Sequence, residues 1–147
     1  MTTTIKSNSD GSSAIQTNGV DRIQIDTSGV PLLVTTPSTG DNSKKIATTE
    51  FVSNTALGVG QTWVNATGIR SANTPYVNDT SRPILVTVAT QANSTTNSGA
   101  LNVDGVNTSV QGLGNGLSNS QTSVVPAGST YRLNTVNQVI TLWSELR

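Results

Sequence analysis

Residues 40–52 read GDNSKKIATTEFV, a short helix signal between two segments that otherwise have the pattern of strands and turns. At 3.6 residues per turn, its apolar side chains point in several directions instead of sharing one stripe. A helix of about a dozen residues is marginal alone in water. The stretch therefore predicts a helix packed among neighbours, an oligomer neck over residues 40–60. The residues expected in this neck are Ile46, Ala47, Phe51, Val52 and Leu57.

The ends of the predicted helix carry capping signals. Ser43 or Thr48 can cap its first turn, and Glu50 places a carboxylate near the positive end of the helix dipole. Gly58 and Gly60 follow the last apolar residue, as is usual after a helix. These signals place the neck between a segment that precedes it and a segment that follows it.

The preceding segment, residues 14–39, contains a repeat at a ten-residue offset. AIQTNGV at Ala14–Val20 aligns with QIDTSGV at Gln24–Val30, and each unit ends in an Asn-Gly or Ser-Gly turn. Two such units cannot close a core, which favours an intertwined β shaft stacked against other chains. The alternative is a plain hairpin between Arg22–Asp26 and Pro31–Thr35. Residues 1–13 are polar, and we expect them to be flexible or to anchor the chain to a larger structure.

The segment after the neck, residues 61–147, predicts eight short strands and so a β-sandwich head, jelly-roll-like in type. Asp104-Gly105 lies between alternating segments and predicts a type I′ hairpin turn. The glycine-rich stretch 111–121 predicts a mobile loop. The eight expected strands are Gln61–Thr67, Thr74–Val77, Pro83–Thr90, Ala100–Val103, Val106–Val110, Gln121–Val125, Thr130–Leu133 and Val136–Leu146.

The composition favours a β-rich chain that associates with copies of itself. Hydrophobic residues are 33% and charged residues 11%, against about 45% and 25% in an average globular chain. Thr, Val and Ile are abundant, which favours strands over disorder. Aromatic residues are only 3%, so we expect burial between chains to supplement a lean core.

Most enzymatic chemistry is excluded by residue type. The chain has neither cysteine nor histidine, which removes disulfides, thiolates and the commonest general base and metal ligand. Its carboxylates are scattered and form no calcium loop, and no phosphate-binding glycine loop is present. We therefore expect no catalytic residue, no cofactor and no metal. The net charge is +0 with scattered basic residues, so nucleic acid is an unlikely partner, and no apolar run is long enough for membrane insertion.

Receptor binding is the more serious candidate. Four aromatic residues offer flat faces to sugars, but Trp63 and Trp143 fall inside predicted strands, and we expect both in the core. Loops held by a rigid scaffold are better recognition sites, which favours the loops at 91–99 and 111–121. The residues that we expect to face a receptor there are Asn93, Asn97, Asn115 and Asn119.

Two stretches resemble a known family. Residues 41–52, DNSKKIATTEFV, are similar to a DNS-x-x-IATT-x-FV signature of tail fibre proteins of tailed bacteriophages. Residues 58–88, GVGQTWVNATGIRSANTPYVNDTSRPILVTV, resemble the opening of the β-rich tip that follows it there, and ITLWSELR at 140–147 resembles the close of such tips. Together these similarities cover most of residues 14–147. Tail fibres are usually much longer, so the resemblance leaves open a short tail, collar or head fibre.

This resemblance implies a homotrimeric virion protein with a shaft, a neck and a head, assembled in the host cytoplasm. Its implied partners are two further copies of itself, other virion proteins through the N-terminus, and a glycan or protein receptor on the bacterial surface. The function expected from sequence is therefore attachment of a virion to its host. The alternatives are a purely architectural collar, head or decoration fibre, and a lectin-like carbohydrate-binding module.

Overall fold

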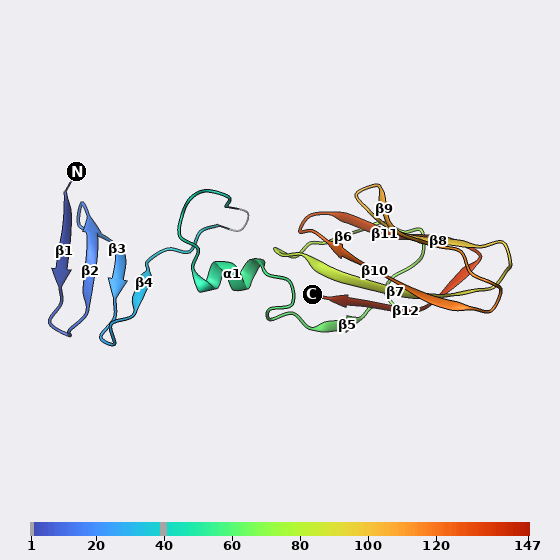
Figure 1. Ribbon diagram of the computed structural model, residues 1–147, viewed down its shortest axis with the longest axis horizontal. Helices are drawn as coiled ribbons and strands as arrows, with labels where there is room; N and C mark the ends of the chain where they lie inside the picture. The colour runs from blue at the N-terminus through green and yellow to red at the C-terminus, as the bar shows by residue number, and fades with distance from the viewer. Residues whose placement is uncertain (1, 39–40) are drawn as a thin grey trace. The chain divides into compact units, whose positions relative to one another are not determined.

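The computed structural model describes residues 2–38 and 41–147, which divide into two compact units, 1–52 and 53–147. In this part of the chain the structure is mainly β, with twelve strands and one short helix. Every pairing between strands is antiparallel (Figure 1). The prediction of a mainly β chain is therefore confirmed. The two units are described in turn.

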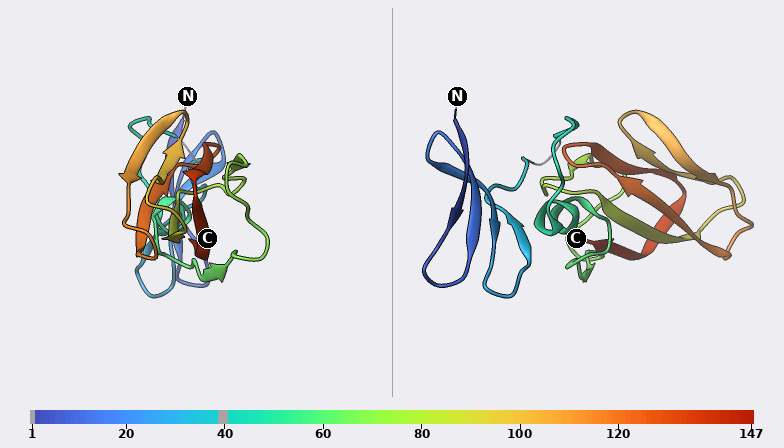
Figure 2. Two further views of the ribbon diagram at one scale, coloured as in Figure 1. Left: turned by 90° about the vertical axis from the view of Figure 1, so that its right-hand side faces the viewer. Right: turned by 60° about the vertical axis from the view of Figure 1, so that its left-hand side comes forward.

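The first unit is an antiparallel sheet of four strands in chain order. Asn18 and Gly19 form the turn between the second and third strands, with φ of 50° and 76°, and positive φ at both positions is what a type I′ hairpin turn requires. Figure 2 shows this unit from two further sides. Its strands are β1 (Thr3–Ser7), β2 (Ser13–Thr17), β3 (Val20–Ile25) and β4 (Pro31–Leu33).

Pairing within this sheet bears on two of the sequence expectations. β3 and β4 pair with Ile23 opposite Leu33, so within one chain this segment forms the hairpin that the sequence left as the alternative to a shaft. Strand β1 lies inside residues 1–13, where flexibility or anchoring was expected. It pairs with β2, and Ile5 lies opposite Ile15. The polar composition concealed this strand, because an edge strand with an exposed face needs few apolar residues.

The helix α1 (Thr49–Thr55) is shorter than the sequence predicted. The Thr48 hydroxyl caps it by accepting a hydrogen bond from the Phe51 amide at 3.0 Å, and Glu50 lies in its first turn. Ser43 does not cap the helix, because its amide donates to the Asp41 carboxylate at 2.9 Å. This local turn competes with helix formation. Residues 46 and 47 therefore precede the helix, and residue 57 follows it.

The second unit contains two four-stranded sheets, in the orders β10-β7-β12-β5 and β6-β11-β8-β9 (Figure 1). Each of the eight strands overlaps one of the predicted strands. The bounds are β5 (Trp63–Asn65), β6 (Tyr76–Val77), β7 (Ile84–Ala92), β8 (Ser98–Val103), β9 (Val106–Gln111), β10 (Ser118–Val125), β11 (Thr130–Val136) and β12 (Gln138–Leu146).

Both sheets contribute to one hydrophobic core. Buried side chains alternate along β7, whose Val86 and Val88 share the core with Leu101 of β8 and Leu133 of β11. Trp143 is fully buried at its centre, as predicted, and the ring of Tyr131 lies 6.5 Å from it. A core that is continuous between two facing sheets is the arrangement of a sandwich.

The expectation that Trp63 belongs to the core was wrong. Its side chain is 56% exposed. Trp63 begins the edge strand β5 and lies opposite Leu146 of β12. Leu146 is three residues after Trp143, which points into the core, so Leu146 points to the outer face, as does Ser144. Successive side chains of a strand point to opposite faces, so this register directs Trp63 to the outer face of the sheet.

Of the connections between strands in the second unit, one agrees with the sequence prediction and two differ from it. Asp104 and Gly105 have φ of 48° and 85°, and they join β8 to β9 as the predicted hairpin turn. Asn137, with φ of 52°, separates Val136 from the last strand, with which the sequence had grouped it. The glycine-rich loop is shorter than predicted, because residues 118–121 belong to β10.

Candidate assembly and receptor-binding surfaces

The sheet of the first unit carries a row of aliphatic side chains that is only partly covered. Ile5, Ile15, Ile23 and Leu33 lie opposite one another across all four strands. Ile5 at the edge is 80% exposed, and among the residues described in this unit only Ala14 is a buried hydrophobic residue. A sheet normally buries one face against a second layer. This unit, described on its own, therefore has an apolar face with no layer to cover it.

A groove beside this row contains two of the predicted neck residues. Its volume is ≈ 500 Å³, and its lining includes Ile23 and Leu33 of the sheet together with Ile46 and Ala47. Ile46 remains 67% exposed. The Thr48 hydroxyl donates to the Thr36 hydroxyl at 3.1 Å, which ties the segment before α1 to the segment after β4. The groove is thus mainly aliphatic and open.

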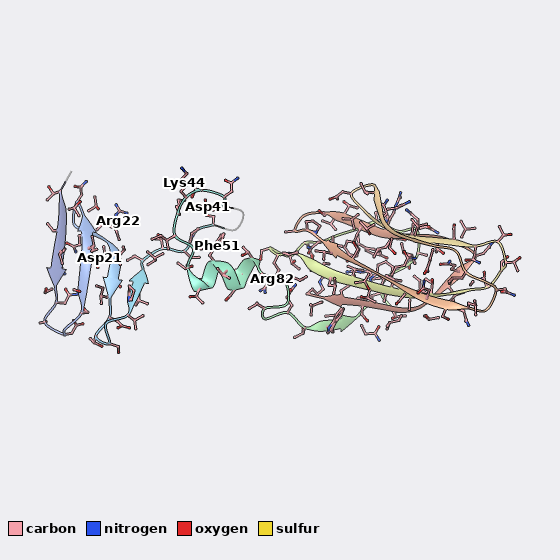
Figure 3. All side chains as sticks on the ribbon, viewed as in Figure 1. Asp21, Arg22, Asp41, Lys44, Phe51 and Arg82 are labelled. Carbon is pink, nitrogen blue, oxygen red and sulfur yellow. The ribbon has the colours of Figure 1, made fainter. Side chains whose placement is uncertain are left out.

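The remaining neck residues lie on α1 or after it. Phe51 is half-buried (Figure 3) and Val52 is exposed, and both belong to the first unit. Leu57 follows the helix in the second unit and is also exposed. The helix contains no buried residue. Its apolar side chains therefore remain partly open to a partner, as a neck requires.

The loops at one end of the second unit are bound to one another, and we call residues 93–97, 112–117 and 137 the tip. The amide of Asn93 donates to the carbonyl of Asn137 at 3.1 Å, and the side chain of Asn137 donates to the carbonyl of Thr96 at 2.8 Å. The amide of Gly116 donates to the carbonyl of Ala92 at 2.8 Å. These bonds hold three connections as one surface.

The four predicted receptor residues divide into two groups. Asn93 and Asn115 are exposed at the tip, and Asn119 is exposed nearby on β10. The side chain of Asn97 instead makes hydrogen bonds within the tip. Its amide nitrogen donates to the carbonyls of Ser94 at 2.8 Å and Leu113 at 2.6 Å, and its oxygen accepts from the Leu113 amide at 3.0 Å. The side chain of Asn97 therefore links the loops of the tip to one another.

A buried layer of polar side chains lies beneath the tip, and sequence reasoning missed it. Thr90 donates to the Gln138 side-chain oxygen at 2.9 Å and accepts from the Gln111 amide at 2.7 Å. The Gln138 amide donates to Asn97 at 2.9 Å, and Gln121 accepts from the Leu101 backbone amide at 2.9 Å. Glutamine residues at inward positions of alternating strands were the sequence signal that could have predicted this layer. The layer connects the tip to the core strands.

A second polar cluster surrounds Glu145, which is 1% exposed. Its carboxylate accepts hydrogen bonds from the Arg70 guanidinium at 2.9 and 3.1 Å and from the Tyr131 hydroxyl at 2.7 Å. It also accepts from the Trp143 indole at 3.1 Å and from Arg147 at 3.0 Å. The Arg70 guanidinium lies 4.4 Å from the centroid of the Tyr76 ring. The signal for this site was a lone acid within an otherwise apolar strand.

The pKa values in this cluster indicate structural pairing. Burial acts to raise the pKa of Glu145, but the hydrogen bonds from Arg70 and Tyr131 and the nearby positive charges lower it overall. Burial and the bond to Glu145 raise the pKa of the Tyr131 hydroxyl above its ordinary range. Glu145 therefore stays ionised and Tyr131 neutral at neutral pH. A fully paired carboxylate of this kind has no free lone pair directed at a substrate.

Across residues 2–38 and 41–147, no group of three or more acidic side chains is arranged to hold a metal ion. Within the same residues, no helix is both long and apolar enough to cross a bilayer. Comparison of the chain with protein-family models, curated proteins and solved structures found no match.

Proposed function

We propose that this protein is a short homotrimeric viral fibre that displays a jelly-roll-like β head for attachment to a bacterial surface. The observation that carries the proposal is the partly exposed row of Ile5, Ile15, Ile23 and Leu33 in the first unit. Considered by itself, the first unit leaves part of this face in water. A fibre buries the same face between copies.

Three copies supply the missing layer. When three sheets close around a shared axis, each apolar row packs against the rows of the other two, and the groove lined by Ile46 and Ala47 lies at the edge of that contact. Burying aliphatic surface contributes about 25 cal/mol for each Å² removed from water. In this arrangement the first unit is the shaft and α1 is the neck, where the three chains find their register.

The tip suits recognition of an uncharged surface. Residues 83–103 and 105–131 contain no charged side chain, so the tip offers amides and hydroxyls as donors and acceptors. Such groups are complementary to the hydroxyls of neutral glycans. Three tips per fibre and several fibres per particle raise the effective concentration of weak sites, so attachment does not need a tight single contact. The N-terminal strand is the part that we assign to contact with other virion proteins.

Adsorption measures this function directly. Purified protein is labelled and mixed with a panel of bacterial strains, and the adsorption of phage that carries the protein is measured with and without excess free protein. Attachment predicts binding to susceptible strains and reduced phage adsorption. A fully assembled protein that binds no sensitive strain contradicts attachment and supports the architectural alternative.

Glycan arrays separate attachment through sugars from a general lectin activity. A fibre head of the proposed kind binds glycans of its own host strains and loses that binding when Asn93 and Asn115 at the tip are replaced by alanine. A head that binds common glycans as a monomer supports the lectin alternative. The exposed residue Val106, which follows the Asp104-Gly105 turn and lies outside the tip, provides the control substitution by alanine.

A further inference from the structure

We propose that the outer face of the sheet β10-β7-β12-β5 is a self-association face, on which the heads of neighbouring copies pack against one another. This inference rests on the proposed function, because it deepens the homotrimer by naming the surface that the head contributes. It concerns the second unit alone and uses the register of its strands.

A row of apolar side chains crosses all four strands of this face. Leu85 of β7 lies opposite Val124 of β10 and Leu146 of β12, and Leu146 lies opposite Trp63 of β5. Val124 and Trp63 at the two edges are exposed. The row repeats, in the second unit, the arrangement of Ile5 to Leu33 in the first. Each unit, taken by itself, thus has a sheet with a partly exposed row of apolar side chains.

The rest of this face is uncharged, with small polar side chains directly beside the apolar row. The row beside the apolar one consists of Thr122, Thr87, Ser144 and Asn65, which are opposite one another by the same register. Further from it lie Ser120, Ala89 and Leu142. A face that meets copies of itself must not carry a net charge, because like charges would then face each other across the contact. The absence of charge from these positions is therefore an argument for a second copy as the occupant.

The outer face of the other sheet is less suited to this contact. Its central strand β11 carries Arg132 opposite Asn102. It is also hollowed by a groove of ≈ 300 Å³ that is lined by Asn73, Asn107 and Asn134 among others. The aliphatic side chains of Val110 and Val136 also line this groove. The feature that makes this face less suited is therefore the charge of Arg132, which would face its own copy across a contact. The two outer faces of one head therefore differ in charge, and only the face of the sheet β10-β7-β12-β5 is free of the fixed charge that would oppose self-association.

The position of the row within the head also favours other copies as the occupant. Trp63 begins the first strand of the second unit and Leu146 ends the last one, so the row lies at the end of the sheet where the chain enters from α1. If the first units assemble, covalent continuity holds the heads at high effective concentration. Eight paired positions on each of three strands and three on β5 give a face of about 450 Å². This is more than half of the about 800 Å² per partner in a standard interface, and the first units contribute the remainder.

Thiol protection tests this face in the full-length protein. The chain has no cysteine, so Ser144→Cys on the proposed face and Ser98→Cys on the outer face of the other sheet each introduce one reporter. In the assembled protein we expect Ser144→Cys to react with a maleimide at least tenfold more slowly than Ser98→Cys. Denaturation in urea is expected to make the two rates equal.

Tryptophan quenching gives a second measurement without a new thiol. Trp143 is fully buried. The difference in acrylamide quenching between the native protein and the Trp63→Phe variant therefore reports how accessible Trp63 is to the quencher. We expect Trp63 to be shielded in the assembled protein and accessible in Val124→Lys. Val110→Lys, which adds the same charge to an exposed valine of β9 on the other sheet, is expected to leave Trp63 shielded.

The outcomes separate this inference from the proposed function. An assembled protein in which residue 144 reacts as fast as residue 98, and in which Trp63 is freely quenched, overturns the self-association face and leaves the fibre standing. A folded monomer overturns both. Shielded Trp63 and slow reaction at residue 144, lost in Val124→Lys and kept in Val110→Lys, support the inference.

Discussion

Glu145 and Arg70 form a two-point ion pair inside the head, with Nε–Oε1 at 2.9 Å and Nη2–Oε2 at 3.1 Å. Seventy-five residues separate the two side chains in the sequence. The pair fixes the connection between β5 and β6 to the last strand of the sandwich. Because Tyr131 and Trp143 donate to the same carboxylate, the cluster also orients the aromatic part of the core.

Replacing Glu145 by alanine is expected to destabilise the head strongly. The change leaves the Arg70 guanidinium without its partner and removes the acceptor of two buried donors, which costs about 3–5 kcal/mol when one member of a buried pair is lost. Urea unfolding followed by near-UV circular dichroism, at fixed protein concentration, measures this. Asp79→Asn removes the exposed partner of Arg147 and is expected to cost at most about 1 kcal/mol. Equal losses in the two variants would contradict the role of the cluster.

The same pair makes the stability of the head depend on pH. The folded-state pKa of Glu145 is lowered, so its contribution is fully present above the ordinary glutamate value of about 4.3 and is lost as the pH falls below it toward the folded value. We expect the free energy of unfolding to fall more steeply between about pH 5 and pH 3 in the native protein than in Glu145→Gln. Parallel pH profiles for the two proteins would show that Glu145 carries no such linkage.

The tip is expected to lose its order when Asn97 is replaced by alanine. The substitution removes the side-chain bonds to Ser94, Leu113 and Gln138, so hydrogen exchange at residues 93–97 and 112–117 becomes faster and adsorption to host cells falls. The oligomeric state is expected to remain unchanged. Asn115→Ala, which alters an exposed neighbour, is the control for exchange. Unchanged exchange in Asn97→Ala would mean that the loops do not depend on this side chain.

Two adjacent residues of β1 test the shaft. Ile5 belongs to the aliphatic row, whereas Thr4 lies opposite Gln16 on the other face of the sheet. Because Ile5 is exposed in the single chain, Ile5→Lys is not expected to disrupt the strand itself. It places a charge in the proposed contact between copies, so assembly is expected to weaken by at least tenfold, whereas Thr4→Lys leaves it intact. Sedimentation velocity over a concentration series distinguishes them, and equal weakening would argue against the row as the contact.

Local signals in the sequence were sufficient for the strands of the head and for its hairpin turn, but not for β1. Asp104-Gly105 has the positive φ angles expected of its hairpin turn, and each predicted strand of the head overlaps one in the structure. Thr48 caps the helix as its position suggested. Features of this kind depend on residues a few positions apart, so a single sequence contains the information.

Features that depend on distant pairings were not predicted. Trp63 reads as a core residue because it lies in an apolar strand, and only its register with Leu146 directs it to the outer face. Trp143 and Arg147 are two residues from Glu145. Its other partners, Arg70 and Tyr131, come from a distant connection and strand that no spacing in the sequence identifies. Asn97 resembles a recognition residue by type and loop position. The hydrogen bonds of its side chain to neighbouring loops depend on how the tip folds, which the sequence does not show.

The molar mass of the full-length protein in solution tests the central claim most directly. Multi-angle light scattering after size exclusion, near neutral pH and at about micromolar concentration, is expected to give three times the chain mass of 15.2 kDa, with Ile5→Lys shifted toward one. A folded species of one chain mass at every concentration would contradict the account.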